Sequence, residues 1–332
     1  MDTAVVRPRL RIIIVNYRLA DMVADCLRSL EPEVGDDVEV VVVDNDSPDD
    51  SFATLSRLIP ENGWDRFATL VASPKNGGFA YGNNVGIRPV LGTAQAPEYY
   101  MLLNPDTTVR PGALATMLEF MDAHPGVGIV GPRIESPNGV PQSASFRFPS
   151  LPSELLRGLQ LGIVSELLKD YAVVRPQDDE AHQTDWVSGA AMIIRAEVVD
   201  TIGLMDDGYF LYYEETDYCL QAHRSGFSVW HLPSARVVHA AGSSTGVAGA
   251  DESMKKQRRL PRYWNESRHR YFRKNYGPLV AAAADLLYGS SFASWRLRTR
   301  LMGKRDLAPP FVVRDLLRFR MEEAGLLKPP SR

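Results

Sequence analysis

The chain has 332 residues, of which 45% are hydrophobic and 23% are charged, a composition typical of globular proteins. This length allows one large α/β domain or two medium domains. Residues 1–11 lack the apolar stretch of a signal peptide, and no window reaches the ~20 apolar residues that span a bilayer. Two cysteines, Cys26 and Cys219, share no metal-ligand or redox spacing. We therefore expect a cytoplasmic protein in a reducing compartment.

Charge is distributed unevenly along the chain. The formal net charge is −4, but residues 251–332 hold 19 Lys and Arg against 8 Asp and Glu. An acidic body therefore carries a basic tail, which indicates an anionic surface or partner for the tail. Nucleic acid is not expected as a partner, because the acidic body would repel a phosphate backbone.

Strand-like and helix-like patterns alternate over the first half of the chain. Residues 10–16 form a run rich in β-branched residues, and residues 19–30 have helical spacing. The alternation repeats with strands at 38–43, 67–72 and 99–103 and with helices at 50–59, 78–91 and 111–123. Continuous apolar strands separated by helices predict an α/β fold with a parallel sheet covered on both faces. Ligands of such sheets bind beyond the carboxyl ends of the strands.

The pattern is looser beyond residue 127. A Pro-rich segment at 132–152 and a helix-like stretch at 152–168 are assigned to the acceptor side. Further strands are predicted at 187–194 and 228–239, and a helix at 214–225. The tail is predicted to be helical, with a basic, aromatic-rich helix at 251–276 and further helices at 279–287 and 311–324.

Polar residues follow the second and third predicted strands. Asp44 ends the second strand and could accept the imide N–H of a nucleobase, although Asp46 or Ser47 could simply cap the next helix. The third strand leads into a glycine turn at 76–78 that opens a helix, whose free N–H groups could face an anionic ligand. An ordinary tight turn is the alternative.

Two more strand ends carry candidate metal ligands. Asp106 follows a buried strand, and carboxylate oxygens suit Mg²⁺ or Mn²⁺, whose shell substrate phosphates commonly complete. A turn-forming Asn-Pro-Asp is the alternative for this residue. His239 ends another strand before a small, hydroxyl-rich loop and could bind the metal, or it could be a structural histidine.

Three carboxylates gather at the start of the predicted helix at 214–225. Glu214, Glu215 and Asp217 follow the aromatic-rich run 209–213. Helix capping and the helix dipole explain some of this acidity. Apolar rings around an acid would raise its pKa, which is the property of a general base.

Together these segments resemble the inverting family-2 glycosyltransferases with the GT-A fold, most closely the bacterial rhamnosyltransferase branch that acts on cell-surface polysaccharide precursors. The resemblance covers residues 10 to about 276 and rests on seven motifs in family order: IIIVNYR, VVVDNDSPDDS, NGGFAYGNN, LLNPDTTV, WVSGAAMIIR, YEETDYCLQAHRSGF and HAAGSSTG. Each motif alone is weak, but the ordered set is specific.

The resemblance implies a GT-A-type, Rossmann-like mixed sheet, mainly parallel and flanked by helices. Residues 1–250 would form the catalytic domain, with a nucleotide-binding part at about 8–130 and an acceptor part at about 131–250. Residues 251–332 would form a basic helical extension that contacts a membrane surface or a second copy. Within it, residues 255–276 suit an anionic membrane face, and a solvated helix packed on the catalytic domain is the alternative.

The resemblance also assigns roles to individual residues. The nucleotide-binding residues would be Asn16, Asp44, Asn76, Gly77, Asn84 and Asp106. Trp186, Ser188 and Gly189 would line the acceptor or donor sugar, Asp106 and His239 would hold Mn²⁺ or Mg²⁺, and Glu215 with Glu214 and Asp217 would form the catalytic group.

Two positions depart from the family pattern. Asn104 stands where the first Asp of the family's DXD-type motif would be, which is usual in this branch and leaves one charge fewer for the metal. Glu215 stands where the family has its catalytic Asp, and its side chain is one methylene longer.

The activity that the resemblance implies is transfer of a sugar from dTDP-L-rhamnose, or from a UDP-linked donor, to a lipid-diphosphate-linked saccharide. One alternative is a sugar-1-phosphate nucleotidyltransferase, but residues 16–19 are not the Gly-rich basic loop that it needs. A non-catalytic binder of nucleotide sugars or glycans is the other alternative, motivated by Asn104 and Glu215. Dinucleotide-dependent oxidoreduction is disfavoured, because no GxGxxG follows the first strand.

Overall fold

The computed structural model describes residues 7–159, 161–240, 259–304, 306 and 308–328. The described chain divides into two compact units. The first comprises Met1–Phe146, Arg175–Phe210 and Glu214–Gly249, and the second comprises Arg147–Val174, Leu211–Tyr213 and Ala250–Arg332. We call them the sheet unit and the helical unit.

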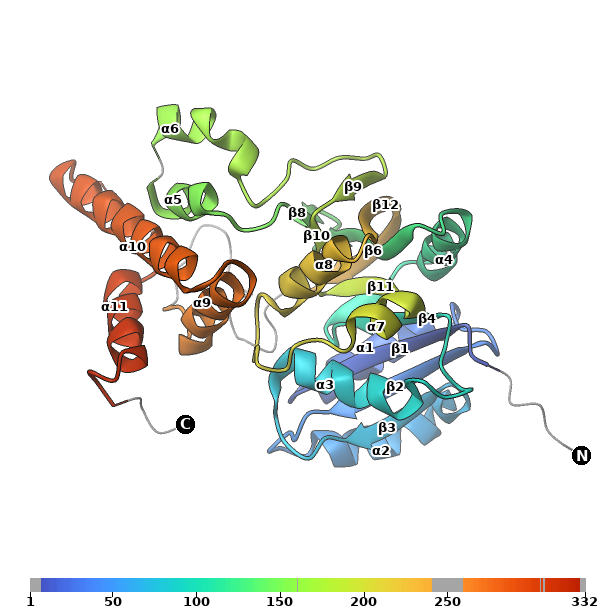
Figure 1. The fold of residues 1–332 in the computed structure, drawn as a ribbon. Coiled ribbons are helices and arrows are strands. Elements are labelled where there is room, and N and C mark those ends of the chain that lie inside the picture. Colours follow the sequence, from blue (N-terminus) through green and yellow to red (C-terminus); the bar gives the residue numbers. More distant parts are fainter. Residues whose placement is uncertain (1–6, 160, 241–258, 305, 307, 329–332) are drawn as a thin grey trace, which may run out of the picture. The chain divides into compact units, whose positions relative to one another are not determined.

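The first half of the sheet unit has the predicted strand–helix alternation (Figure 1). Its elements are β1 (Leu10–Asn16), α1 (Ala20–Leu30), β2 (Val38–Asp44), α2 (Ser51–Glu61), η1 (Trp64–Arg66), β3 (Ala68–Ala72), α3 (Gly78–Ile87), η2 (Arg88–Val90), β4 (Tyr99–Leu103), β5 (Thr107–Val109) and α4 (Ala113–Ala123). The remaining elements are β6 (Val127–Glu135), β7 (Pro141–Gln142), β8 (Ser145–Phe146), β9 (His182–Thr184), β10 (Trp186–Val187), β11 (Ala191–Arg195), α7 (Ala196–Ile202), α8 (Glu214–Arg224) and β12 (Ser228–His239).

The main sheet is mixed, with the strand order β3-β2-β1-β4-β11-β6-β12-β5. Strands β3, β2, β1 and β4 pair in parallel, as predicted. Strand β11 is antiparallel to both of its neighbours, β4 and β6, while β6 and β12 are parallel. The carboxyl ends of β1, β2 and β4 therefore meet at one edge, where the polar motif residues begin.

Alternate residues of β1 face opposite sides of the sheet. Ile12 and Ile14 pack in the core with residues of α1 and α2. Ile13 and Val15 face α3, where a Cβ added to Gly86 or Gly82 would lie 2.8 or 2.5 Å from their side chains. Helices therefore cover both faces of this part of the sheet, as the apolar runs indicated.

Two predictions for the second half of the chain were wrong. Residues 127–135 form the central strand β6, although Pro132 made this region look irregular. The predicted strand at 187–194 is broken, because Ser188, Gly189 and Ala190 form a turn between β10 and β11. The turn matters for the site, because it lies between the ends of two strands.

The helical unit contains α5 (Leu151–Leu159), α6 (Gly162–Leu167), η3 (Lys169–Tyr171), α9 (Arg262–Tyr276), α10 (Pro278–Leu301) and α11 (Val312–Glu323). Helix α10 is much longer than the predicted helix at 279–287. The described residues of the stretch 152–168, which the sequence assigned to the acceptor side, belong to the helical unit. No described helix is long and apolar enough to cross a membrane.

A buried ion cluster holds α9 in the helical unit. Arg268 is fully buried, and its guanidinium donates to Glu154 at 2.7 Å and to Asp285. The same guanidinium lies over the ring of Tyr288, with 4.4 Å to the ring centroid. His269 contacts the second oxygen of Asp285 at 2.9 Å. One cation of the basic tail, Arg268, is therefore internal to the helical unit.

The close packing of α3 against β1 leads to the first testable prediction. Gly82→Val should lower the free energy of unfolding by about 1–3 kcal/mol, because the added side chain would overlap Val15. Urea denaturation followed by circular dichroism measures this change. The control is Gly126→Val, at an exposed glycine with no atom within 4 Å of its added Cβ. Equal stability of both variants would contradict the close packing.

Candidate active site

Asp44 and Asn16 join the ends of β2 and β1. Asp44 is buried, and its Oδ1 accepts a hydrogen bond from Asn16 Nδ2 at 2.7 Å while its Oδ2 accepts one from the Ser47 backbone N–H at 3.0 Å. Asn16 Oδ1 accepts from the Leu19 N–H at 3.0 Å. The pair therefore fixes both loops, and each Asp44 oxygen keeps a lone pair for a further donor. Ser47 does not cap the next helix, which begins at Ser51.

The glycine turn before α3 is tied to β2 by two asparagines. Asn45 Nδ2 donates to Asn76 Oδ1 at 3.1 Å, and the Gly78 N–H donates to the same oxygen at 3.2 Å. Gly78 has φ +85°, and a Cβ there would lie 1.8 Å from the carbonyl oxygen of Phe210. Only glycine fits this position.

The N-terminus of α3 is less open than the sequence indicated. The Phe79 N–H donates to the Phe210 carbonyl at 3.0 Å, and the Gly78 N–H is bonded to Asn76. Two of the first N–H groups of the helix are thus occupied, so the expected row of free donors for an anion is not present. Gly77, the residue before the helix, lies against the ring of Tyr81.

Asn84 makes a pair of buried hydrogen bonds to the backbone. Its Nδ2 donates to the Met205 carbonyl at 2.8 Å, and its Oδ1 accepts from the Met205 N–H at 3.1 Å. The residue is 1% exposed. This geometry ties α3 to the segment that leads to Phe210.

Asn104, Asp106 and His239 form one cluster. His239 Nε2 lies 3.2 Å from Asp106 Oδ1 and 3.3 Å from Asn104 Nδ2. The antiparallel pairing of β12 with β5, in which His239 is opposite Thr107, creates this contact. The Ala240 N–H also donates to the Asp106 carbonyl at 3.0 Å. The family resemblance assigned Asp106 and His239 to one metal, and the strand order brings their side chains into contact.

The cluster fits a divalent cation that is shared with a substrate. Two ligands at right angles around a cation are about 3 Å apart when each bond is about 2.1 Å, which matches the spacing of Asp106 Oδ1 and His239 Nε2. Among the residues that the structure describes, no three His, Cys, Asp or Glu side chains form a metal-holding group. Oxygen atoms of a substrate would therefore have to complete the coordination shell.

The Glu215 carboxylate has a raised pKa at this edge. Burial raises the pKa of Glu215 to about 7, although the backbone N–H groups of Glu215 and Thr216 partly oppose the shift. The residue as a whole is half-buried, but its Oε2 is buried and has no hydrogen-bond partner among the described residues. Its neighbours Glu214 and Asp217 are buried in the first turn of α8, and Asp217 accepts a hydrogen bond from Gln221.

Gly189 brings the β10–β11 turn against Glu215. A Cβ added to Gly189 would lie 3.6 Å from the Glu215 side chain and 3.5 Å from the ring of Phe79. Phe79 was not singled out in the sequence, although it lies inside the glycine-turn motif. The next residue of the turn, Ala190, accepts a hydrogen bond from the Asn104 N–H at 2.9 Å. Glu215 and the Asn104 cluster therefore flank the same turn.

The other two predicted sugar-binding residues lie on the same segment. Trp186 stacks on Phe146, with 4.1 Å between ring centroids and 15° between ring planes. The Ser188 N–H donates to the Ala144 carbonyl at 3.1 Å, and Ser188 Oγ accepts from the Ala190 N–H at 3.3 Å. Ser188 thus shapes the turn that presents Gly189.

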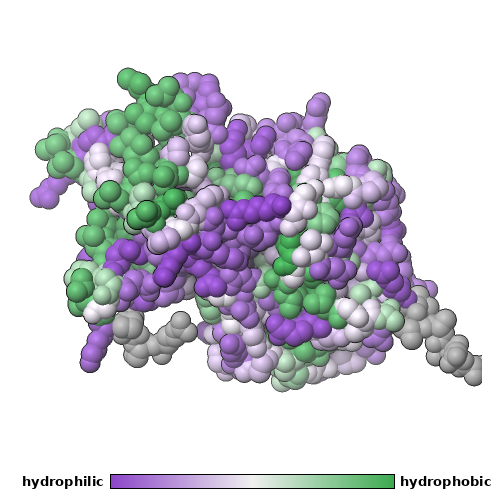
Figure 2. Space-filling view, viewed as in Figure 1, coloured by the Kyte–Doolittle hydropathy of each residue, from purple (hydrophilic) through white to green (hydrophobic). Residues whose placement is uncertain are grey.

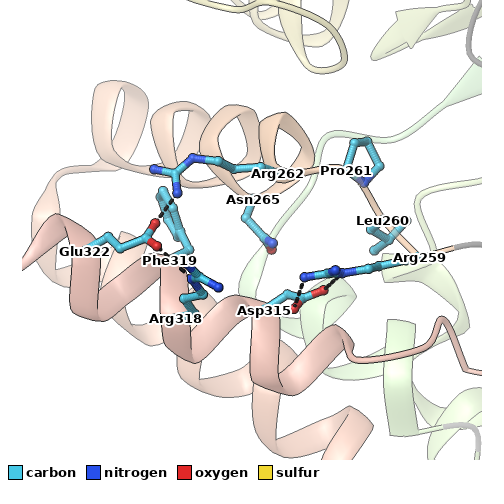
Figure 3. Close-up of a pocket in the computed structure, with 9 residues that line it drawn as sticks. All are labelled: Arg259, Leu260, Pro261, Arg262, Asn265, Asp315, Arg318, Phe319 and Glu322. Carbon is cyan, nitrogen blue, oxygen red and sulfur yellow. Dashed lines mark hydrogen bonds and ion pairs between the residues drawn. The ribbon is translucent and has the colours of Figure 1, made fainter. Parts of the chain in front are cut away.

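A cavity of about 370 Å³ in the helical unit contains none of these residues (Figure 3). It lies between α9 and α11, and its arginines are paired with its acids. Arg259 donates to both oxygens of Asp315 at 2.6 and 2.8 Å, and Arg262 and Arg318 both contact Glu322. The predicted site residues therefore lie outside this cavity, in the sheet unit.

Residues 11–193, more than half of the chain, match the family model for glycosyl transferase family 2. The chain belongs to this family. Glycosyltransferase activity agrees with the site at the edge of the sheet. Membership in family 2 excludes the alternative of a sugar-1-phosphate nucleotidyltransferase.

Named relatives place the glycosyltransferase in the rhamnosyltransferase-like branch. It is 25% identical over 251 residues to the N-acetylglucosaminyl-diphospho-decaprenol L-rhamnosyltransferase of Mycobacterium tuberculosis, which covers 71% of this chain and 78% of the relative. It is 27% identical over 230 residues to the low-salt glycan biosynthesis hexosyltransferase Agl10 of Haloferax volcanii, covering 69% and 66%. The dTDP-rhamnosyl transferase RfbF of Shigella flexneri is 23% identical over 221 residues, covering 66% and 68%.

Solved structures confirm the GT-A fold. The mannosyltransferase PcManGT from Pyrobaculum calidifontis, in complex with GDP-Man and Mn²⁺, has a TM-score of 0.54 at 17% identity and covers 97% of this chain and 82% of its own. Residues 1–349 of S. aureus TarS with UDP-GlcNAc have a TM-score of 0.52 at 17% identity, covering 96% and 84%. The predicted mixed, mainly parallel sheet is therefore correct for the glycosyltransferase.

The pKa of Glu215 makes a prediction about stability. A carboxyl group whose pKa is higher in the folded than in the unfolded protein loses stability as the pH rises from its unfolded pKa to its folded pKa. Glu215→Gln should therefore gain about 1–3 kcal/mol of unfolding free energy over the wild type between pH 5 and pH 8. Urea denaturation across this pH range measures the difference. Glu197→Gln, at an exposed acid of α7, is the control; a difference for Glu215→Gln that stays constant with pH would refute the raised pKa.

Proposed function

We propose that the glycosyltransferase is a metal-dependent inverting enzyme that transfers a hexose to a saccharide acceptor. The observation that carries this proposal is that Glu215 Oε2 is buried near Gly189 and has no hydrogen-bond partner among the described residues. The turn of residues 188–190 lies between Glu215 and the cluster of Asn104, Asp106 and His239. A carboxylate whose pKa is near 7 is suited to take a proton at neutral pH. The cluster of Asn104, Asp106 and His239 would hold a cation on the leaving group's side of the reaction.

The proposed donor is dTDP-L-rhamnose. Several relatives are named as rhamnosyltransferases, and one is named for a dTDP-linked rhamnosyl donor. A UDP-linked sugar is the alternative, since a structural neighbour is in complex with UDP-GlcNAc. In either case Asp44 and Asn16 would contact the nucleoside from the ends of β2 and β1.

The proposed acceptor is a saccharide on a lipid diphosphate. This follows from the printed name of the mycobacterial relative, whose acceptor is an N-acetylglucosaminyl-diphospho-lipid. Trp186 and Gly189 would line the sugar. An enzyme that uses such an acceptor would act at the inner face of the plasma membrane.

Asp106 and His239 would hold Mn²⁺ or Mg²⁺, which would neutralise the charge of the departing nucleoside diphosphate. Glu215 Oε2 accepts the proton of the acceptor hydroxyl while the hydroxyl oxygen forms a bond to the anomeric carbon of the donor sugar. The bond from that carbon to the diphosphate oxygen breaks on the opposite face, so the anomeric centre inverts. Glu214 and Asp217 act by shaping the first turn of α8 around Glu215.

Replacing the proposed base tests the function directly. Glu215→Gln should lower kcat about 10²–10⁴-fold with little change in donor affinity, because it removes only proton transfer. Glu215→Asp, which keeps the carboxylate, should retain more activity than Glu215→Gln. Nucleoside-diphosphate release measures turnover, and calorimetry measures donor binding. Near-normal turnover of Glu215→Gln would remove Glu215 from this role, and no turnover by the wild type would favour a non-catalytic binder.

Metal binding can be tested without turnover. Mn²⁺ should raise the melting temperature of the wild type further when dTDP or UDP is present, because ligands stabilise the state that binds them. Asp106→Ala and His239→Ala should lose this Mn²⁺-dependent increment. Asp65→Ala, at an exposed acid, is the matched control and should keep it. An unchanged increment in both cluster variants would show that the cation does not bind at Asp106 and His239.

A further inference from the structure

Large exposed apolar side chains concentrate on the helical unit. Of the twenty such side chains that the described residues present, sixteen belong to this unit, although it is the smaller of the two. Figure 2 shows the apolar colour gathered over α6 and along α10. Single exposed leucines are ordinary, but a contiguous set indicates a surface that meets another apolar phase.

Helix α10 has two distinct faces. Its inward face is buried and includes Ala284, Tyr288 and Phe292. At about 100° per residue, four leucines lie within a stripe of about 60° on the opposite face. They are Leu279, Leu286, Leu297 and Leu301, which are 85%, 71%, 60% and 77% exposed.

The exposed charges at the carboxyl end of α10 are mostly positive, and the exposed Asp306 beyond the helix is paired with Arg296 and accepts a hydrogen bond from Trp295. Asp285 is the one acidic residue within α10, and it is buried against Arg268 and His269. Arg300 lies in the exposed last turn, and the exposed Lys304 follows the helix. The outward side of α10 therefore combines leucines with cations and presents no carboxylate.

Helix α6 adds a second apolar element. Ile163 and Leu167 are 88% and 79% exposed, and no residue of α6 is buried. A helix that buries nothing gains no stability from the core, so its apolar residues are left for an external partner.

The basic segment 255–276 that the sequence assigned to a membrane face is partly internal over its described residues, 259–276. In α9 the buried residues are Asn265, Ser267, Arg268, His269, Tyr271 and Phe272. The cations Arg270, Arg273 and Lys274 are exposed, but Tyr276 is the one large exposed apolar side chain among these described residues. Most of the exposed apolar surface of the helical unit lies on other helices.

We propose that the outward leucine stripe of α10, together with α6, docks the protein on an anionic lipid bilayer. Leucines on one side of a helix enter the boundary between headgroups and acyl chains, and nearby cations bind anionic headgroups. Because the leucines form a stripe along one side of α10, the helix would lie in the plane of the bilayer surface. A second copy of the chain fits less well, because two such faces would bring like charges together.

The docking surface stands apart from the proposed transfer reaction, since it involves no residue of the sheet-edge site. It would nevertheless bring the enzyme to the surface where a lipid-linked acceptor resides. Vesicle binding can be measured without donor or acceptor, so failure of one proposal leaves the other intact.

Co-sedimentation of the full chain with vesicles tests the docking surface. The wild type should bind vesicles of phosphatidylcholine with phosphatidylglycerol more tightly than vesicles of phosphatidylcholine alone, and added salt should reduce the difference. The triple variant Leu286→Ser, Leu297→Ser and Leu301→Ser should bind at least about tenfold more weakly. The charge variant Arg300→Glu with Lys304→Glu should lose the preference for the anionic lipid.

The control replaces exposed apolar residues of the sheet unit. Phe52→Ser with Val140→Ser, at side chains 40% and 58% exposed, should bind vesicles as the wild type does. Circular dichroism checks that each variant is folded. Wild-type binding by the leucine variant would overturn the proposal. A wild-type dimer that binds no vesicles and becomes a monomer in the leucine variant would assign the surface to a second copy instead.

Discussion

The antiparallel pairing of β12 with β5 is the constraint on which the site depends. It carries His239 to the side chains of Asn104 and Asp106, across 135 positions of sequence in the case of Asn104. The ladder fixes the backbones, so the three side chains need no flexible loop to meet. A site built on strand ends holds its geometry because the ladder hydrogen bonds of the sheet support it.

The second constraint is the approach of Gly189 to Glu215. The turn between β10 and β11 has no side chain at this point, which leaves room beside the buried carboxylate. Burying an acid without a partner costs stability, and the same burial raises the pKa of Glu215. Such a cost is expected where an acid must exchange a proton. The same group would be a poor choice for holding the fold together.

Basic side chains of the helical unit are found in two environments, one buried and one exposed. Arg268 is buried between Glu154 and Asp285, where it specifies how α5, α9 and α10 pack. Arg300 and Lys304 are exposed beside an apolar stripe. Net charge along the sequence cannot distinguish these environments, because it counts buried and exposed arginines alike.

The sequence by itself determined the strand–helix alternation of the first half and the polar residues at the strand ends, because apolar periodicity and turn chemistry are local properties. It also pointed to Glu215, whose apolar neighbours precede it in the chain. Only the tertiary structure decided that Pro132 lies within a central strand, that the first two N–H groups of α3 are occupied, and that Asn84 bonds to Met205. The contact of His239 with Asp106 was expected from the family resemblance alone, because strand order creates it and local patterns do not. The burial of Arg268 and His269 in α9 was set by helix packing, which joins residues far apart in the chain.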